Sequence, residues 1–189
     1  AGNTYSEDDV ASAQGLQLNN DLFWGGSTFD LTKSQVDGDT FLAGQKVTIN
    51  GSSVLGSCFT AGQTINVKDA AFGGSIRAAG ETISMSNTYV TNNVTAAGQT
   101  ITFDKTSSTR GFTAAGQTIE LDGTCACADL SGEDVVVHGI VNGDASISAK
   151  SITIAKDAVI DGTLNASSSV EPAIESGAPV GSVQFTQTA

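Results

Sequence analysis

The sequence predicts an all-β chain that coils into a right-handed parallel β-helix, a solenoid of about eight rungs of roughly 18 residues each. The first observation is a phrase that recurs along the chain as AGQKVTI, AGQTINV, AGETISM, AGQTITF and AGQTIEL. Its copies begin at one constant interval, at Ala43, Ala61, Ala79, Ala97 and Ala115. A fixed short period is typical of architectures in which each unit stacks on the previous one.

The second observation is an apolar alternation inside each copy. We count positions from the repeated alanine, which is position zero. Positions four and six are apolar in every copy, and mostly polar residues separate them. Because successive side chains of a strand point to opposite faces, this pattern predicts a strand with one buried face. The members of the two columns are Phe29, Val47, Ile65, Ile83, Ile101, Ile119, Val135 and Ile152 at position four, and Leu31, Ile49, Val67, Met85, Phe103, Leu121, Val137 and Ile154 at position six.

A second strand is expected before each zero position. Mostly apolar residues recur three and seven positions before zero, as in Ile76 and Phe72. Glycines such as Gly38 and Gly56 recur five positions before zero, where they permit a bend or leave room for a neighbouring side chain. We expect the Ala-Gly pair at zero and one to form a corner, with the alanine pointing inward and the glycine at positive φ.

The handedness follows from the period. A left-handed hexapeptide helix requires an apolar residue at every sixth position, but steps of six from Ile101 reach Ser107 and Thr113. This failure favours the right-handed β-helix. The period divides the chain into an N-terminal lead-in or cap at 1–17, the repeat domain at 18–166, and an irregular C-terminal coil or cap at 167–189.

The composition limits the partners. The 189 residues carry a net charge of −12, which disfavours nucleic acid and anionic lipid surfaces. No apolar run approaches the roughly 20 residues of a membrane span. The chain opens with AGNTYSEDD and has no initial methionine. We therefore expect a mature product that is exported to the cell envelope or beyond.

Two stretches resemble a known family. VNGDASISAKSITIAKDAVIDGTL, at 141–164, resembles the bactofilin signature, and VDGDTFLAGQKVTINGSSVLGS resembles the exported polymer-forming repeat proteins of prokaryotic envelopes. The resemblance implies a right-handed β-helix that polymerises end to end without a nucleotide and serves as a scaffold. It implies no catalytic residues. Such relatives often continue into membrane helices, so the full-length protein is expected to carry them outside this segment.

Few residues suggest chemistry. Cys125 and Cys127 lack the further ligands that zinc requires, and His138 has no nucleophile placed beside it in the sequence. We therefore predict no enzyme activity, no catalytic residue, no metal site and no cofactor. A column of outward threonines at position three, which includes Thr64, Thr82, Thr100 and Thr118, is the feature that would suit ice binding.

The predicted function is a structural scaffold or envelope surface module that self-associates through the rod ends. The alternatives are a carbohydrate- or ice-binding solenoid and a small polysaccharide-active enzyme. Trp24 is the strongest aromatic candidate for a sugar. We expect the N-terminal end to associate head to head, through Leu18, Leu22, Phe23 and Trp24 of its first rung.

Overall fold

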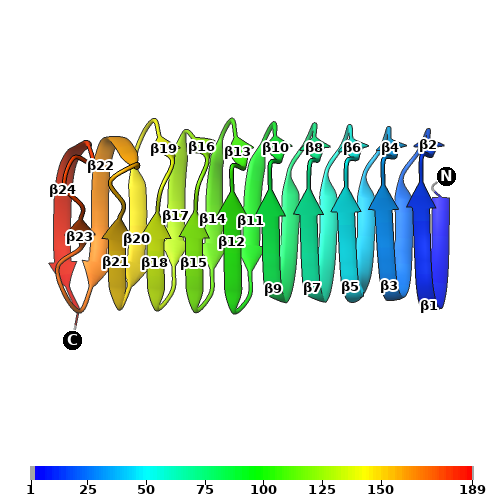
Figure 1. Ribbon diagram of the computed structural model, residues 1–189, viewed down its shortest axis with the longest axis horizontal. Helices are drawn as coiled ribbons and strands as arrows, with labels where there is room; N and C mark the ends of the chain where they lie inside the picture. The colour runs from blue at the N-terminus through cyan, green and yellow to red at the C-terminus, as the bar shows by residue number, and fades with distance from the viewer. Residues whose placement is uncertain (1–2, 189) are drawn as a thin grey trace.

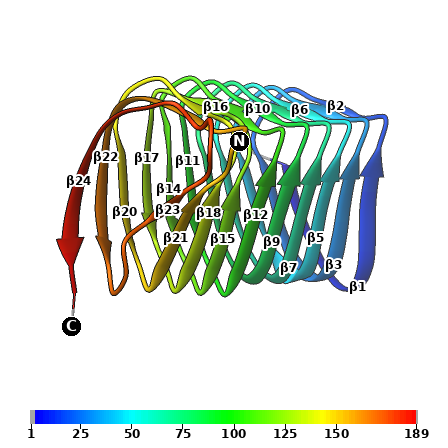
Figure 2. The same ribbon diagram turned by 60° about the vertical axis from the view of Figure 1, so that its left-hand side comes forward.

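Stacked parallel strands account for the fold of the computed structural model, which describes the backbone of residues 3–188 and the side chains of residues 14–188. The chain winds into a solenoid of about 10 coils of about 18 residues (Figure 1). It ascends along the front, crosses the top and descends behind as it advances from the N- to the C-terminal end, which makes the coil right-handed (Figure 2). The predicted fold class is confirmed.

Each N-terminal coil contains one long strand and one two-residue strand. The long strands pair in parallel, each with the next, and the short strands form a separate sheet along one edge. The long strands are β1 (Asn3–Gln14), β3 (Leu22–Thr32), β5 (Thr40–Asn50), β7 (Cys58–Lys68) and β9 (Ile76–Ser86), and the short strands are β2 (Gln17–Leu18), β4 (Gln35–Val36), β6 (Ser53–Val54), β8 (Ala71–Phe72), β10 (Tyr89–Val90) and β13 (Ser107–Ser108).

From residue 93 onward the long strand divides in two at its bend. The resulting halves are β11 (Asn93–Ala97), β12 (Thr100–Asp104), β14 (Gly111–Ala115), β15 (Thr118–Leu121), β17 (Cys127–Ser131), β18 (Asp134–Val137), β20 (Ala145–Ala149) and β21 (Ser151–Ile154). The two-residue strands β16 (Thr124–Cys125) and β19 (Ile140–Val141) continue the column of short strands after β13. The last coil is formed by β22 (Val159–Ser168), β23 (Ala173–Ile174) and β24 (Val180–Gln187). No described segment is helical.

The coil count exceeds the predicted eight because both flanks stack. Strand β1 pairs in parallel with β3, and β24 pairs in parallel with β22. Neither flank carries the repeated phrase, yet backbone hydrogen bonds join strands whatever their side chains. Residues 1–17, predicted to be a lead-in or cap, thus contribute β1, while residues 1 and 2 lie outside the described part of the chain.

The predicted apolar columns form the core. Ile101 pairs in register with Ile83 and Ile119, and the three side chains are fully buried. Thr100 is exposed and Thr102 is half-buried on the opposite face of β12. The register of positions four and six is therefore confirmed, and each column becomes a continuous ladder along the rod at about 4.8 Å per coil.

The expected orientation at the corner is wrong. The repeated alanines are exposed, and the residue before each of them points inward instead. Among these inward residues are Leu42, Thr60 and Ala78, all of which are buried. The strand bends directly after the alanine. The alternation of inward and outward side chains that holds after the bend therefore cannot be extended to the residues before it.

The corner glycines are required for close approach and not for positive φ. A Cβ atom on Gly80 would lie 2.1 Å from the carbonyl oxygen of Gly62 in the preceding coil. Positive φ occurs at a different corner, eight positions after zero, as at Asp69 (50°) and Asn87 (45°). Asparagine and aspartate tolerate this left-handed conformation better than most other residues do.

The glycines five positions before zero leave room for a neighbouring side chain, as predicted. A Cβ atom on Gly56 would lie 2.1 Å from Oδ1 of Asp39. This Asp39 oxygen accepts a hydrogen bond of 2.7 Å from the backbone N–H of Ser57 in the next coil. Such contacts satisfy backbone donors where the chain turns.

Candidate functional site

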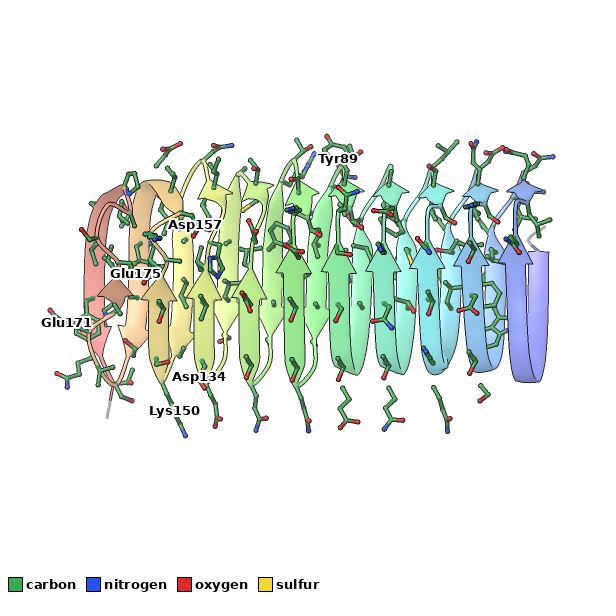
Figure 3. The ribbon with its side chains drawn as sticks, viewed as in Figure 1. Tyr89, Asp134, Lys150, Asp157, Glu171 and Glu175 are labelled. Atoms are coloured by element: carbon green, nitrogen blue, oxygen red, sulfur yellow. The ribbon has the colours of Figure 1, made fainter. Side chains whose placement is uncertain are left out.

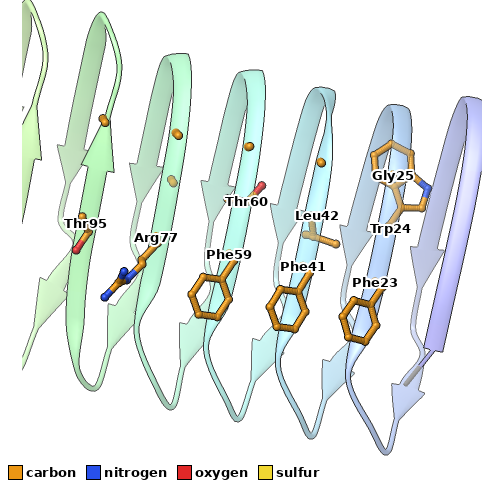
Figure 4. Close-up of a pocket in the computed structure, with 14 residues that line it drawn as sticks. Phe23, Trp24, Gly25, Phe41, Leu42, Phe59, Thr60, Arg77 and Thr95 are labelled. Atoms are coloured by element: carbon orange, nitrogen blue, oxygen red, sulfur yellow. The ribbon is translucent and has the colours of Figure 1, made fainter. Parts of the chain in front are cut away.

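An apolar hollow runs along one face of the N-terminal half of the rod. Outward side chains two positions before zero form a ridge, and the outward residues at position zero form a floor beside it (Figure 4). We call the two together the lateral trough, a hollow of about 710 Å³ that is largely open to solvent. The ridge consists of Phe23, Phe41, Phe59, Arg77 and Thr95, and the floor consists of Gly25, Ala43, Ala61, Ala79 and Ala97.

The three phenylalanines of the ridge stack on one another. The ring centroids of Phe23 and Phe41 lie 4.7 Å apart, and those of Phe41 and Phe59 lie 5.1 Å apart, with the ring planes parallel to within 5°. This offset stack follows from the register, because the coil spacing nearly equals the separation that aromatic rings prefer. Phe23 and Phe59, the two end rings of the stack, remain 37% and 39% exposed.

Arg77 continues the ridge in the next coil, where it pairs in register with Phe59 (Figure 4). It is the one charged residue among those that line the trough. Its guanidinium makes no ion pair and no hydrogen bond with the side chains that the structure describes. An unpaired cation therefore ends an apolar row, in a chain whose net charge is −12.

The same face is polar in the C-terminal half. There the column of the ridge continues as Asp129, Ser146, Asn165 and Gln184, beside Ser148 and Ser167 on the floor. The backbone follows the same parallel register in both halves. The apolar character of the trough is thus a property of its side chains and not of the fold.

The C-terminal end of the rod leaves core positions uncovered. Val183 pairs in register with the fully buried Leu164, yet it is 45% exposed. Ile174 pairs with the fully buried Ile154, yet it is 38% exposed. Both residues continue inward columns of the solenoid, and no further coil among the described residues covers them.

Three of the four predicted end-to-end contact residues lie in β3 of the second coil, and Leu18 lies in β2, the first of the short strands. Leu22 and Trp24 are buried, and Leu18 is partly buried against the core. Phe23 lies on the lateral face as the first ring of the ridge. Strand β1 stacks on β3 from the N-terminal side, so the long-strand edge at that end belongs to β1, while the short-strand edge belongs to β2, which contains Leu18. Association through these four residues remains a prediction.

His138 joins acidic residues of the two neighbouring coils. Its Nε2 lies 3.1 Å from Oε1 of Glu120, and its Nδ1 lies 3.0 Å from Oδ1 of Asp157, which is labelled in Figure 3. Burial by itself lowers the pKa of His138. The hydrogen bond with Asp157 and the charges of Asp157, Glu120 and Asp122 outweigh burial, so the pKa lies above its usual value. In its protonated form this histidine bridges three coils.

The three cysteines differ in environment. Cys58 and Cys125 are buried, and burial raises the pKa of each thiol to about 12. Cys127 is exposed, because the bend at Ala126 interrupts the alternation between the two neighbouring cysteines. Among the described residues, no group of three or more His, Cys, Asp or Glu side chains is placed to hold a metal ion.

The threonine column faces outward as predicted. Thr64, Thr82, Thr100 and Thr118 pair in register on successive coils. This register alone does not test ice binding, which stays a prediction. None of the described segments forms a helix long and apolar enough to cross a membrane.

The fold and these surfaces define a parallel β-solenoid repeat protein. No family model, no curated protein and no solved structure matches the chain. The resemblance to bactofilins therefore rests on the quoted sequence stretches alone, and the function has to be argued from the surfaces of the rod.

The phenylalanine ridge is a feature that sequence reasoning missed. We singled out Trp24, which is 3% exposed and packs on Phe29 inside the rod. The signal for the ridge was present in the sequence, since Phe23, Phe41 and Phe59 recur with the period of the repeat. To assign that column to the outer face, however, one must know how the strand bends at the corner, and the sequence does not show this.

Proposed function

We propose that the chain is a structural rod, a scaffold module of the bactofilin-like, polymer-forming kind that associates end to end. The observation that carries the proposal is the exposed core at the C-terminal end, where Val183 and Ile174 occupy inward columns that no coil among the described residues covers. A second rod stacked on this end would bury them as the coils of one rod bury one another. Exposed apolar surface of this kind commonly marks an interaction site.

Strand edges at both ends suit such stacking. Within residues 3–188, β1 pairs only with β3 and β24 pairs only with β22, so each leaves one edge free. Free edges of this kind are templates for pairing with another chain. Pro172 and Pro179 precede β24 and do not interrupt it. We therefore infer head-to-tail stacking, in which β24 of one rod pairs in parallel with β1 of the next.

Charge opposes this association. Glu171 and Glu175 lie near the C-terminal end (Figure 3), and the β1 segment contains Glu7, Asp8 and Asp9. Added salt screens such repulsion over distances beyond roughly 8–10 Å at 0.10–0.15 M. Assembly should therefore strengthen as the ionic strength rises.

The experiment is light scattering and negative-stain microscopy of the 189-residue chain at rising protein and salt concentrations. We expect filaments that Val183→Asp together with Ile174→Asp abolishes, because both substitutions place charges in the stacked interface. The matched control is Leu55→Asp, which alters another exposed apolar residue on the side of the rod. A chain that stays monomeric under all conditions contradicts the proposal.

Deletions separate the two geometries of stacking. Head-to-tail filaments are lost on removal of either residues 1–17 or residues 180–189. Head-to-head association through the N-terminal end gives dimers, and only the first deletion dissolves them. The proposed location in the cell envelope, outside the cytoplasm, rests on the sequence resemblance and needs localisation of the native protein.

The lateral trough does not favour the carbohydrate alternative. Sugars stack on the open faces of aromatic rings, but the rings of Phe23, Phe41 and Phe59 partly cover one another. Arg77 and Thr95 are the only side chains of the ridge with hydrogen-bonding groups. Such a surface offers few polar partners for the hydroxyl groups of a sugar.

A further inference from the structure

We propose that the lateral trough binds a monomeric anionic amphiphile with one unbranched alkyl chain, of the fatty-acid type. The chain lies along the alanine floor beside Phe23, Phe41 and Phe59, and its carboxylate pairs with Arg77. This inference concerns the side of the rod and does not depend on association through the ends.

The shape of the trough supports a thin, extended ligand. The floor of small residues from Gly25 to Ala97 spans five successive coils, and the taller ridge stands along it. The trough is largely open to solvent, and its volume of about 710 Å³ lies within the roughly 300–1,000 Å³ that is common for small-molecule sites. The trough is straight because each coil repeats the last, so it fits an extended chain better than a compact ligand.

The chemistry of the lining supports an alkyl chain. Alanine methyl groups and phenylalanine rings present hydrocarbon to the ligand, and burying them removes apolar surface from water. Phe23 and Phe59 are more than one-third exposed on a rod whose other outward columns are mostly polar. A chain in the trough covers this exposed surface without displacing any core residue.

Arg77 determines the charge of the ligand. Its guanidinium has no partner among the described side chains, and it stands where the apolar ridge ends. Guanidinium groups bind carboxylates through two parallel hydrogen bonds. An anion at one end of an apolar chain satisfies both parts of the site.

Charge also argues against two other occupants. In a symmetric contact between two copies, Arg77 of each copy would face an apolar lining that offers no counter-charge, which is a costly arrangement. An anionic bilayer would be repelled by the net charge of −12. A single free molecule carries only one negative charge, so the net charge repels it far less than it repels an anionic bilayer.

The coil spacing sets the length of the ligand. Three coil steps of about 4.8 Å separate Arg77 from Phe23, which gives about 14 Å. An extended alkyl chain advances about 1.25 Å per carbon, given C–C bonds of about 1.5 Å. About 11 to 12 carbons therefore span the phenylalanine ridge.

The test is isothermal titration calorimetry of the full chain with octanoate, decanoate, dodecanoate and tetradecanoate, each below its aggregation concentration. We expect affinity to rise about two- to fourfold per added carbon up to about 12 carbons and then to level off. Dodecanol should bind at least about tenfold more weakly than dodecanoate, since it lacks the charge that Arg77 recognises. An absence of dodecanoate binding overturns the proposal.

Matched variants identify the site. Ala61→Gln fills the floor with an uncharged side chain and should abolish binding, while Phe41→Ser should weaken it at least tenfold. Arg77→Gln should reduce dodecanoate affinity to that of dodecanol, whereas Arg110→Gln, at an exposed arginine outside the trough, should leave it unchanged. Circular dichroism melts establish whether each variant is folded. If Phe41→Ser does not fold, Ala61→Gln alone tests the apolar part of the site.

The outcomes distinguish the rival occupants. Equal loss with Arg77→Gln and Arg110→Gln shows nonspecific attraction and overturns the site. If the chain forms dimers that Ala61→Gln dissociates, and if it does not bind dodecanoate, the occupant of the trough is a second copy of the chain. Binding to anionic vesicles but not to monomeric dodecanoate identifies a bilayer. Each of these results contradicts the proposed ligand.

Discussion

The two halves of the lateral face share a backbone and differ in their side chains. In the N-terminal half, outward Phe23, Phe41 and Phe59 stand beside a floor of alanines. In the C-terminal half, Asn165 and Gln184 occupy the same column, beside serines. Apart from the uncovered last coil, the inward columns are mostly apolar and buried in both halves.

This difference shows that the inward columns maintain the fold while the outward columns are free to vary. Stacked coils need a continuous apolar interior and paired backbone groups, and both halves provide them. Nothing in the stacking requires phenylalanine on the outside. We therefore regard the apolar half as the part of the face on which a ligand-binding role is concentrated.

The largest expected effect tests the shared core. Ile101→Asp should lower the free energy of unfolding by at least about 4 kcal/mol, because it buries a charge that has no partner. Thr102→Asp, on the outward side of the same strand, should cost about 1 kcal/mol or less. Urea denaturation measures both. Equal losses would contradict the assignment of inward and outward columns.

The next effect tests the close approach of coils at the corner. Gly80→Ala should destabilise the rod by about 2–3 kcal/mol, because the added Cβ atom meets the backbone of Gly62 at 2.1 Å. Gly25→Ala is the control, since its Cβ atom has no neighbour within 4 Å. Thermal melts should show a large loss of stability for Gly80→Ala and little or none for Gly25→Ala. Similar melting temperatures for the two variants would contradict the close approach of coils at the corner.

A smaller effect sharpens the contrast between the two halves of the face. Phe41→Ala should cost about 1–3 kcal/mol, because the middle ring makes two stacking contacts of about 0.5–1.5 kcal/mol each. Phe23→Ala, at the end of the stack, should cost about half as much. Asn165→Ala, in the same column of the polar half, should change stability by less than about 0.5 kcal/mol. An equal loss of stability for Asn165→Ala and Phe41→Ala would contradict the distinction between the apolar and polar halves of the face.

The smallest effect concerns pH. The pKa of His138 is raised in the folded state, so its ion pairs stabilise the fold. This contribution to stability is complete below the pKa of the unfolded state, about 6.5, and is lost as the pH rises through the pKa of the folded state. His138→Gln should therefore reduce stability by about 0.5–1 kcal/mol at pH 5.5 and by less at pH 8.5. Denaturation at the two pH values measures this. A loss that grows with pH would contradict the raised pKa.

Much of the fold was predictable because burial imposes a period on the sequence. The ladder through Ile83, Ile101 and Ile119 follows from the constant interval of the repeat and the alternation along one strand. The lateral trough was not predicted, because it depends on the direction of side chains across a bend. The neighbours of His138 were not predicted either, since Glu120 lies in the coil before it and Asp157 lies in the coil after it. Which side chains of those coils it meets depends on the path of each coil.

The sequence by itself determined the all-β class, the parallel stacking and the apolar columns, because repeated coils bury the same positions at every step. Only the tertiary structure decided that Ala61 points outward and Thr60 inward, since a bend resets the alternation of the following strand. It also decided that Phe23, Phe41 and Phe59 form one stacked row. Residues one full period apart in the sequence become neighbours about 4.8 Å apart only after the coil closes.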